Sequence, residues 1–366
     1  MKKFLSILGL FAATSAFAQL TVKQDGTSES FIYVSDQVLY VADDISVTKS
    51  TEATNETAKA GIYLRDDAQL IQGATQSIAN DGTGFISVYQ DSNSDSYDYN
   101  FWSSPVASSD ATNNFSISNQ IYNPGDSNIT TEVSNFTGSW NGSGESGIDY
   151  NNRTPLSIST AWLYKFNQNN NSWSYLGSSG TVAPGYGFTM KGTNETTGGT
   201  YNIDTNNQFY EFRGRANSGD IRVDLSSTEG NVTLAGNPYP SALDLTAFFN
   251  DPDNDGVASI MYWDEDRTVN SHYYVDNKGG YGTWIPGQPN DGYEQLGPGL
   301  FAVPVFMNYD NNGDPTSSTG NTGDNIPRRY APIGQGFMLK RLGDGPNATA
   351  TFKNSHRVYV PEGETS

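Results

Sequence analysis

Three aspartates stand at alternate positions, Asp251, Asp253 and Asp255, directly before Gly256. Carboxylates at this spacing, followed by a glycine turn, can wrap oxygen ligands around Ca²⁺, as the first half of an EF-hand loop does. A complete EF-hand is excluded because the twelfth position of the loop is Tyr262 and not a glutamate that binds the ion with both oxygens. The pattern therefore predicts either a calcium site or an acidic, solvated turn, in which Asp is favoured for its backbone hydrogen bonds.

Two further acidic runs follow this loop. Asp264, Glu265 and Asp266 come directly after Trp263, and glycoside hydrolysis would need a pair of carboxylates on either side of the scissile bond. Adjacent residues of a strand point to opposite faces, so this run does not by itself form an acid and nucleophile pair, and we interpret it as an exposed acidic turn. The second run, Asp310–Asp314, predicts a flexible insertion with a weaker resemblance to a metal loop.

The composition of the chain excludes most kinds of nucleophilic catalysis and most zinc sites. The chain has no Cys, which excludes thiol nucleophiles, disulfides and zinc sites with Cys ligands. Its two histidines, His272 and His356, would have to supply the base of any Ser-His-Asp triad, and no Gly-x-Ser-x-Gly sequence accompanies either of them. We therefore expect no catalytic residues, and only metals that prefer oxygen ligands remain candidates.

The aromatic residues offer a binding chemistry instead. The chain has 6 Trp, 22 Tyr and 18 Phe, and rings on a sheet face can stack on sugars. The candidate ligand-binding residues lie in one long segment beside two adjacent glycines, and they are Tyr273, Tyr274, Tyr281 and Trp284. The alternative is that rings serve packing, as we expect of residues that recur at matching positions of the two halves, namely Trp102, Trp162, Trp263 and Phe188.

Charge restricts the partners of the protein. With 20 Lys+Arg against 40 Asp+Glu in 366 residues, the formal net charge is -20, and so acidic a chain repels phosphate. Nucleic acid is therefore not an expected partner. Charged residues make up 16% and aromatic residues 13% of the chain, which is too much ring surface for a disordered polymer, so we expect a folded β-rich protein.

The first 18 residues have the three parts of a secretory signal peptide. Lys2 and Lys3 form a basic start, Phe4–Phe11 is apolar, and Ala16–Ala18 ends in a small-x-small cleavage site. No later segment reaches the roughly 20 apolar residues that a membrane helix needs. Cleavage after Ala18 leaves 18 Lys+Arg against 40 Asp+Glu, a net charge of -22. The sequence predicts a secreted or outer-surface protein that engages an export machinery.

Strand patterns dominate the rest of the chain. Ile221, Val223 and Leu225 alternate with polar residues, which predicts a half-buried strand, and turn residues recur about every ten positions. The predicted fold class is all-β, with tandem antiparallel sandwich-like modules and long loops. One short helix is expected to begin with Ser241 as its N-cap and to end near Asn250.

The chain also repeats itself imperfectly. Ala183–Lys191 (APGYGFTMK) reappears with one insertion as Ala331–Lys340 (APIGQGFMLK). Each copy follows a Trp-containing segment and a Pro-containing strand exit, and the gaps between these pieces differ as loop insertions would make them differ. We therefore predict two related β modules, residues 91–215 and 216–358. Chance recurrence in a chain with 38 Gly is the alternative.

The flanking segments complete the expected organisation. Residues 19–90 carry short strands between Asp, Asn and Gly turns, and we expect a few rungs of a β-solenoid or a sheet that caps the first module. Residues 359–366 are expected to be a tail or the start of a further module.

Four phrases of the sequence, in this order, resemble large secreted and cell-surface proteins of Bacteroidetes, many of them cargo of the type IX secretion system: Tyr99–Val106, Gly185–Gly192, Leu234–Asp244 and Phe352–Arg357. Such proteins are typically multi-module and end in a sorting domain that is read during export. This sequence ends at Ser366 without such a module, so we expect either a fragment or another export route. The resemblance implies location and architecture and assigns no catalytic residue.

The sequence alone thus predicts a secreted or cell-surface protein with a structural or adhesive role, no catalytic activity, and Ca²⁺ as the only candidate cofactor. The alternative is a carbohydrate-binding module protein with extracellular polysaccharide as its partner, and an enzyme comes third. Exposed aromatic patches would favour the carbohydrate-binding function, whereas a concave cluster of acids with shifted pKa values would favour the enzyme.

Overall fold

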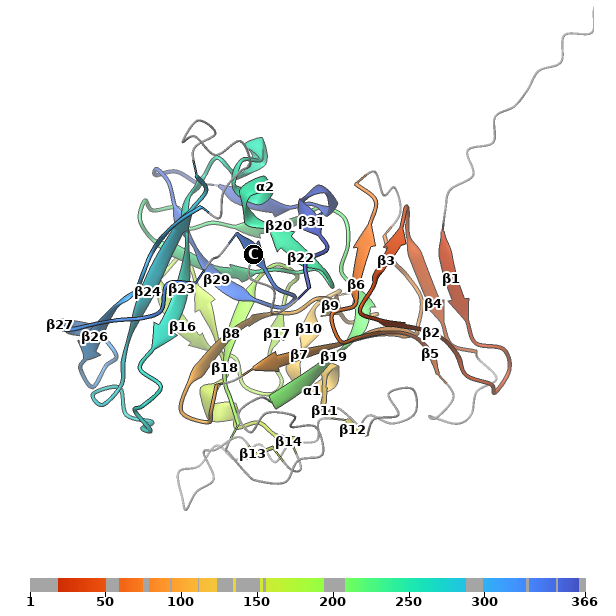
Figure 1. The fold of residues 1–366 in the computed structure, drawn as a ribbon, viewed down its shortest axis with the longest axis horizontal. Coiled ribbons are helices and arrows are strands. Elements are labelled where there is room, and N and C mark those ends of the chain that lie inside the picture. Colours follow the sequence, from red (N-terminus) through yellow and green to blue (C-terminus); the bar gives the residue numbers. More distant parts are fainter. Residues whose placement is uncertain are drawn as a thin grey trace, which may run out of the picture.

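Strands provide nearly all regular structure in the described part of the chain. The structure, a computed structural model, describes residues 19–50, 59–74, 79–92, 94–110, 112–123, 134–135, 152–153, 156–193, 208–287, 299–326, 329–346 and 348–361. In these ranges there are two α-helices, of four and five residues, which confirms the all-β class (Figure 1). No described helix is long and apolar enough to cross a membrane. The predicted signal peptide, residues 1–18, and residues 362–366 of the tail lie outside the described residues.

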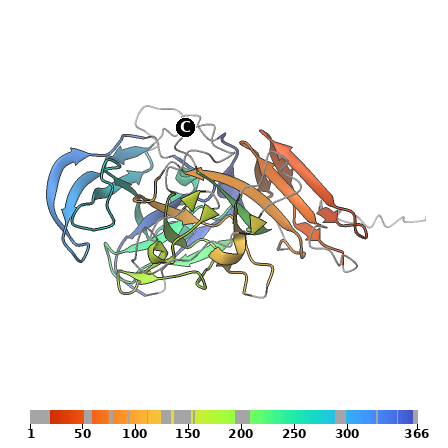
Figure 2. The same ribbon diagram turned by 90° about the horizontal axis from the view of Figure 1, so that it is seen from below.

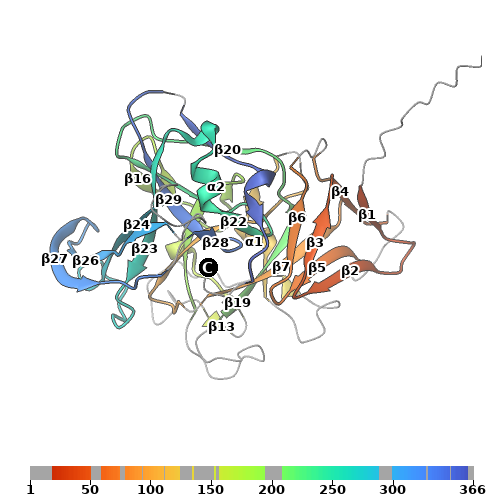
Figure 3. The same cartoon turned by 45° about the horizontal axis from the view of Figure 1, so that its top comes forward.

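The N-terminal segment forms the parallel rungs of a short solenoid. Its strands are β1 (Leu20–Lys23), β2 (Ser30–Ser35), β3 (Val38–Val41), β4 (Ile45–Thr48), β5 (Ala60–Arg65), β6 (Gln69–Gln72) and β7 (Phe85–Ser92). The parallel pairs β1–β4, β2–β5 and β3–β6 stack one rung on the next, and β7 continues the middle column beside β5. Figure 2 and Figure 3 show these strands as a block at one end of the molecule.

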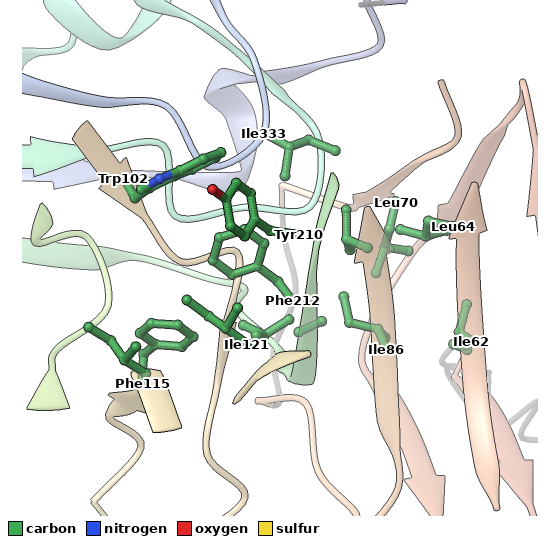
Figure 4. Close-up of a cluster of buried hydrophobic side chains, with 14 of the residues drawn as sticks. Ile62, Leu64, Leu70, Ile86, Trp102, Phe115, Ile121, Tyr210, Phe212 and Ile333 are labelled. Carbon is green, nitrogen blue, oxygen red and sulfur yellow. The ribbon is translucent and has the colours of Figure 1, made fainter. Parts of the chain in front are cut away.

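Module 1 closes this solenoid with an antiparallel strand. β19 (Gln208–Ala216) pairs antiparallel with β7, so the solenoid and module 1 share one sheet. One hydrophobic core lies behind that sheet and joins Ile62 and Leu64 of the solenoid to Trp102 and Phe212 of module 1 (Figure 4). The predicted boundary near residue 90 therefore falls within β7, inside a continuous sheet and core.

Module 1 contains a second sheet with the strand order β16–β15–β18–β8. The elements of module 1 are β8 (Tyr99–Ser103), β9 (Val106–Ala107), β10 (Phe115–Ser116), α1 (Ile117–Gln120), β11 (Ile121–Asn123), β12 (Ser134–Asn135), β13 (Asn152–Arg153), β14 (Leu156–Ser157), the 3₁₀ helix η1 (Thr160–Trp162), β15 (Tyr164–Asn167), β16 (Ser172–Tyr175), β17 (Thr181–Val182), β18 (Gly187–Lys191) and β19.

Module 2 is built around a larger sheet with the order β21–β29–β23–β24–β26–β27 and has a separate hydrophobic core. Its elements are β20 (Ile221–Asp224), β21 (Val232–Gly236), β22 (Ala242–Asp244), α2 (Leu245–Phe249), η2 (Pro252–Asn254), β23 (Val257–Glu265), β24 (Lys278–Ile285), β25 (Leu300–Ala302), β26 (Val305–Tyr309), β27 (Pro315–Thr322), β28 (Tyr330–Ala331), β29 (Gly336–Arg341), β30 (Thr349–Phe352), η3 (Asn354–His356) and β31 (Arg357–Val358).

The strand orders of the two modules correspond. The row β8–β18–β15–β16 of module 1 matches β21–β29–β23–β24 of module 2, and the pair β10–β17 matches β22–β28. In this correspondence Phe188 stands where Phe337 stands, and both are fully buried. The register also corrects one match made from sequence. Trp263 is level with Phe166 in β15 and not with Trp162, which precedes that strand in η1.

The repeated glycine motifs meet at the junction of the modules, and their contacts are reciprocal. Ser103 of module 1 donates its N–H to the carbonyl of Gly334 at 2.8 Å, and Gly236 of module 2 donates to the carbonyl of Gly185 at 3.2 Å. Gly185 and Gly334 both have positive φ, +84° and +76°, so each turn requires glycine. At Gly336 a Cβ would lie 2.6 Å from the backbone of module 1, which shows how closely the modules approach.

The predicted helix is present, but its N-cap was predicted wrongly. α2 begins after Asp244, whose carboxylate accepts hydrogen bonds from the backbone N–H groups of Thr246 and Ala247. Ser241 lies outside the helix, and its hydroxyl accepts a hydrogen bond from the Nε of Arg357 instead. The predicted end was correct, because Asn250 is the C-cap.

The segment from η3 to β31 returns to the solenoid. Asn354 donates its amide to the carbonyl of Gly73 at 3.0 Å, and the guanidinium of Arg357 donates to the carbonyl of Leu70. Further along, the hydroxyl of Tyr359 donates to the carbonyl of Asp36 at 3.2 Å. Both ends of the described chain are therefore joined through side chains that donate to carbonyl groups of the first and second rungs.

Candidate functional site

The predicted calcium loop is held by the protein's own cations. The carboxylate of Asp251 accepts a hydrogen bond from the Nζ of Lys353 at 2.8 Å, and its other oxygen lies 2.9 Å from the Nε2 of His356. Burial opposes ionisation of Asp251, but its hydrogen bonds with Lys353, the backbone of Asp253 and His356 together lower its pKa to about 2. Asp253 pairs with the same ammonium at 2.7 Å, whereas Asp255 is exposed at the end of η2.

No group of three or more His, Asp or Glu side chains suited to a metal ion occurs within the described ranges. A calcium ion at Asp251 and Asp253 would have to displace the ammonium of Lys353 from both carboxylates. Calcium binding at this loop thus stays a prediction, and Lys353 is the cation with which calcium would compete.

The four predicted ligand-binding aromatics do not form one surface. Tyr273 and Tyr274 are 74% and 42% exposed, in the segment between β23 and β24. Tyr281 packs edge-on against Trp263 at a centroid distance of 5.1 Å, and burial raises its pKa well above the usual range. Trp284 is fully buried in the core of module 2 and offers no face to a ligand.

A cleft of about 710 Å³ lies between the modules. β7 and β8 line it from the side of module 1, while β23, β26 and the end of β27 line it from the side of module 2, together with the turn that precedes β29. Its aromatic lining residues are Tyr99, Phe101, Trp102, Tyr262, Trp263 and Phe306. Its hydrogen-bonding lining includes Gln90, Ser92, Asn100, Thr268, Thr322 and Gln335. Of these rings, the sequence pattern singles out Trp102 and Trp263, as packing residues, and does not predict that they line one cleft.

Trp263 is one of the aromatic residues that line this cleft. Its ring is half-buried and lies almost parallel to that of Phe101 across the module junction, with an interplanar angle of 4° and a centroid distance of 6.4 Å. Gly279 of the neighbouring strand lies under the indole, where a Cβ would approach the ring to 2.6 Å. Trp263 can take this position only because Gly279 has no side chain.

The three acidic residues that follow Trp263 make hydrogen bonds with different parts of the structure. Asp264 accepts a hydrogen bond from the backbone N–H of Asp324 at 3.3 Å, whereas Glu265 accepts one from the backbone N–H of Tyr99 at 2.6 Å. Asp266 accepts from the backbone and hydroxyl of Thr268, and these bonds lower its pKa. Asp264 and Glu265 therefore contact opposite sides of β23, as the alternation of a strand requires.

A buried group of titratable residues lies behind Glu265. Lys191 is 1% exposed, and its Nζ lies 4.3 Å from the ring centroid of Trp162 and 3.1 Å from the Nδ1 of His272. Burial lowers the pKa of Lys191, and burial raises the pKa of Glu265. Burial together with the charge of Asp95 raises the pKa of Asp98 to about 6. Such shifts concentrate at functional sites, although structural ion networks produce them as well.

His272 belongs to a segment that crosses from module 2 to module 1, which we call the clasp (residues 266–277). Its imidazole lies between the rings of Tyr97 and Trp162, at centroid distances of 4.8 Å and 4.7 Å. Burial and the nearby charge of Lys191 lower the pKa of His272 to about 4, so the ring is neutral at pH 7. The clasp therefore holds the two walls of the cleft together through uncharged ring contacts.

Comparisons with known proteins identify a family without a described activity. Residues 10–364 match a family model described as "Domain of unknown function (DUF8693)". No curated protein and no solved structure matches the chain. Because the family model spans nearly the whole sequence, the two modules and the solenoid are parts of one family unit, and the chain belongs to the DUF8693 family.

Proposed function

We propose that the protein is an exported, non-catalytic binding protein whose cleft between the modules takes an extracellular carbohydrate. The observation that carries this proposal is the cleft itself, in which the half-buried Trp263 shares the lining with carboxylate, amide and hydroxyl side chains. We also propose that the protein is located at the cell surface and is exported by a route of the type IX kind. Its role there is structural or adhesive, because attachment to a surface glycan is one means of adhesion.

The chemistry of the lining suits a sugar better than other small ligands. The apolar face of a pyranose ring packs against an aromatic ring such as Trp263, while its hydroxyls pair with groups such as Gln90 and Asn100. A phosphorylated ligand would meet mainly carboxylates, with Arg267 the one lining side chain of opposite charge in the described residues. A purely apolar ligand would leave the polar groups of the lining unpaired.

The proposal is tested by titrating the exported chain with a panel of oligosaccharides in a calorimeter. Trp263→Ala is expected to weaken binding of the recognised glycan by about tenfold, since a stacked ring contributes on the order of 1 kcal/mol. Trp263→Phe keeps an aromatic face and should retain most of the affinity.

The matched control is Tyr40→Ala, which removes a 63% exposed ring from the solenoid and should leave binding unchanged. Thermal melts of all three variants establish that they are folded. An absence of heat with every glycan, or full affinity in folded Trp263→Ala, would remove the basis of the proposal.

One observation favours glycoside hydrolysis as a second candidate function. Glu265 lines the cleft, and burial raises the pKa of its carboxyl, as in residues that act as general acids. Release of reducing ends from the bound glycan, abolished in Glu265→Gln, would support hydrolysis. If the glycan is unchanged after prolonged incubation, hydrolysis is excluded and binding stands as the proposed function.

A further inference from the structure

The first rung of the solenoid, which consists of β1, β2 and β3, has a free edge. In the part of the chain that the structure describes, each of these strands pairs only with its neighbour in the second rung, β4, β5 or β6. Ser30 and Asp36 donate their N–H groups to carbonyls on the side of β5. Because the backbone groups of a strand alternate in direction, those of Phe31 and Tyr33 point away from β5 to the free edge.

The hydrophobic core also reaches this end of the solenoid. Four inward-facing side chains of the first rung pack against the core and are only partly buried: Leu20, Ile32, Val34 and Leu39. The second-rung residues that stack on them are at most 2% exposed. The terminal repeat of a solenoid needs a cover of this kind. Module 1 provides it at the other end through β19, whereas the described residues provide none for the first rung.

The strands of the first rung lack the features that usually keep free edges apart. Charged residues, proline and bulges protect exposed edges in natural sheets. The three strands read LTVK, SFIYVS and VLYV, with Lys23 as their one charged residue and no proline, and they pair without a shift of register. Phe31 and Tyr33 of β2 are also 46% and 43% exposed. An uncharged edge with exposed rings, in a chain of net charge -20, is typical of an interaction surface.

The outline of the first rung matches a second copy of itself. The chain passes through β1, β2 and β3 in turn around one core, so a two-fold axis through the middle of β2 reverses this order. It places β2 antiparallel to β2 of the second copy and β1 antiparallel to β3 of that copy. All three edges then gain partners, and the inward-facing side chains of both rungs meet over one continuous core. An unrelated extended peptide would pair with one of the three strands and leave the core open.

Charge and aromatic contacts agree with this arrangement. The two-fold axis brings Lys23, at the end of β1, to Asp36 of the second copy, which precedes β3. Both residues are exposed, and within the described ranges neither takes part in an ion pair. Phe31 ends a row of edge-to-face rings that continues through Tyr63 to Phe85, at centroid distances of 6.0 Å and 5.8 Å. Antiparallel pairing of β2 extends this row, because Phe31 then lies opposite Tyr33 of the second copy.

We propose that the exported protein forms a two-fold dimer through the first rungs of its two solenoids. This inference is independent of the proposed carbohydrate binding, because the cleft lies between the modules and not at the solenoid. In the dimer, Ile32 lies on the two-fold axis and faces its own counterpart. The two copies form one continuous solenoid with a pair of modules at each end.

The test measures the molar mass of the exported chain by light scattering and sedimentation over a range of concentrations. The wild type is expected to be a dimer. Tyr33→Pro removes an N–H group that points to the free edge and keeps every hydrogen bond to β5, so it should raise the dissociation constant of the dimer by about hundredfold.

The matched control is Tyr175→Pro, in β16 at the edge of another sheet. Tyr175 is 59% exposed, and its N–H group points away from β15, because the N–H of the next residue, Leu176, donates to Leu163. This variant should remain a dimer. Circular dichroism and thermal melts establish that both variants are folded.

A crosslinking measurement keeps the test decisive if Tyr33→Pro fails to fold. The chain has no Cys, so Ile32→Cys introduces a single thiol at the two-fold axis. Opposed residues there have Cα atoms about 4.5 Å apart, which suits a disulfide. Mild oxidation should therefore link two copies of Ile32→Cys. Tyr40→Cys, on the outer side of β3 and away from the axis, should stay unlinked.

Several results would overturn the inference. A wild type that is monomeric at every concentration excludes the dimer. A dimer that persists in folded Tyr33→Pro, or that dissociates equally in Tyr175→Pro, does not form through the first rung. Equal crosslinking of Ile32→Cys and Tyr40→Cys, or none in either, excludes the two-fold axis at Ile32.

Discussion

The two modules have the same strand order and differ most in one hairpin. In module 1, β15 and β16 have four residues each, whereas the matching β23 and β24 of module 2 have nine and eight. The longer hairpin carries Trp263 and Glu265 into the cleft and continues into the clasp that reaches back to module 1. The shared positions thus provide the cores and also Trp263, which is level with Phe166 of module 1, whereas the additional length of the module 2 copy provides Glu265 and the clasp.

The equivalence of the two modules is tested first by substitutions in their hydrophobic cores. Phe188 and Phe337 occupy matching positions and are both fully buried, so Phe188→Ala and Phe337→Ala should each lower the free energy of unfolding by about 3–5 kcal/mol. Denaturant unfolding followed by Trp fluorescence measures both. A loss below 1 kcal/mol in one variant and a full loss in the other would show that the two positions are not equivalent in packing.

A feature of module 2 alone should have the next largest effect. Asp251 caps η2 and accepts hydrogen bonds from Lys353 and His356, and Asp251→Ala is expected to cost about 1–2 kcal/mol of stability. Asp255→Ala, at an exposed position four residues on, is the control and should lie within about 0.5 kcal/mol of the wild type. Equal losses in the two variants would argue against the observed contacts of Asp251.

His272 in the clasp should make the folding stability of the wild type depend on pH more strongly than that of a variant without this histidine. The folded-state pKa of His272 is about 4 and its ordinary value is 6.5, so between these pH values the unfolded chain binds a proton that the folded chain does not. The contribution of the neutral ring is complete above about pH 6.5 and is lost as the pH falls toward 4.

His272→Phe keeps the ring between Tyr97 and Trp162 but cannot titrate. Lowering the pH from 7 to 5 should therefore destabilise the wild type more than this variant, as seen in thermal melts. Burial also raises the pKa of Glu265, which has the opposite pH dependence but is present in both proteins. Identical losses in the two proteins would show that His272 is solvated in solution.

The smallest expected effect concerns the calcium loop. If Ca²⁺ binds at Asp251 and Asp253, it competes with Lys353, so calcium should raise the melting temperature of Lys353→Met more than that of the wild type. A chelator should reverse the rise. Melts that are unchanged by calcium and chelator in both proteins would end the calcium prediction.

Local patterns in the sequence predicted the class of fold but not which faces are buried. The alternation of β24 places Trp284 on the same face as Gly280 and Gly282, and period two alone does not tell which face is inside. That face packs in the core of module 2, so Trp284 is a core residue. Tyr281 is on the opposite face of the strand and packs against Phe101 of module 1. The repeated glycine motifs, in contrast, correctly predicted matching turns, because the positive φ at positions 185 and 334 favours glycine.

The site itself depended on contacts that no local pattern contains. Lys191 ends the strand GFTMK and has a counterpart, Lys340, that is half-buried, yet Lys191 is almost fully covered because a segment 81 residues later brings His272 to it. The N-cap of α2 was misplaced for the same reason, since the hydroxyl of Ser241 is used by Arg357. Residue types at the cleft could be listed from sequence, but their convergence could not.

The return of the last strand to the solenoid also has a kinetic consequence. The contact between Arg357 and Leu70 joins residues 287 positions apart, and that between Tyr359 and Asp36 joins residues 323 positions apart. Loops of this length close late and slowly, because the entropy of the intervening chain is lost before the contact is gained. The carbonyl groups of Leu70 and Asp36 gain these partners only when residues 357 and 359 dock, so this part of the solenoid completes its hydrogen bonds late in folding.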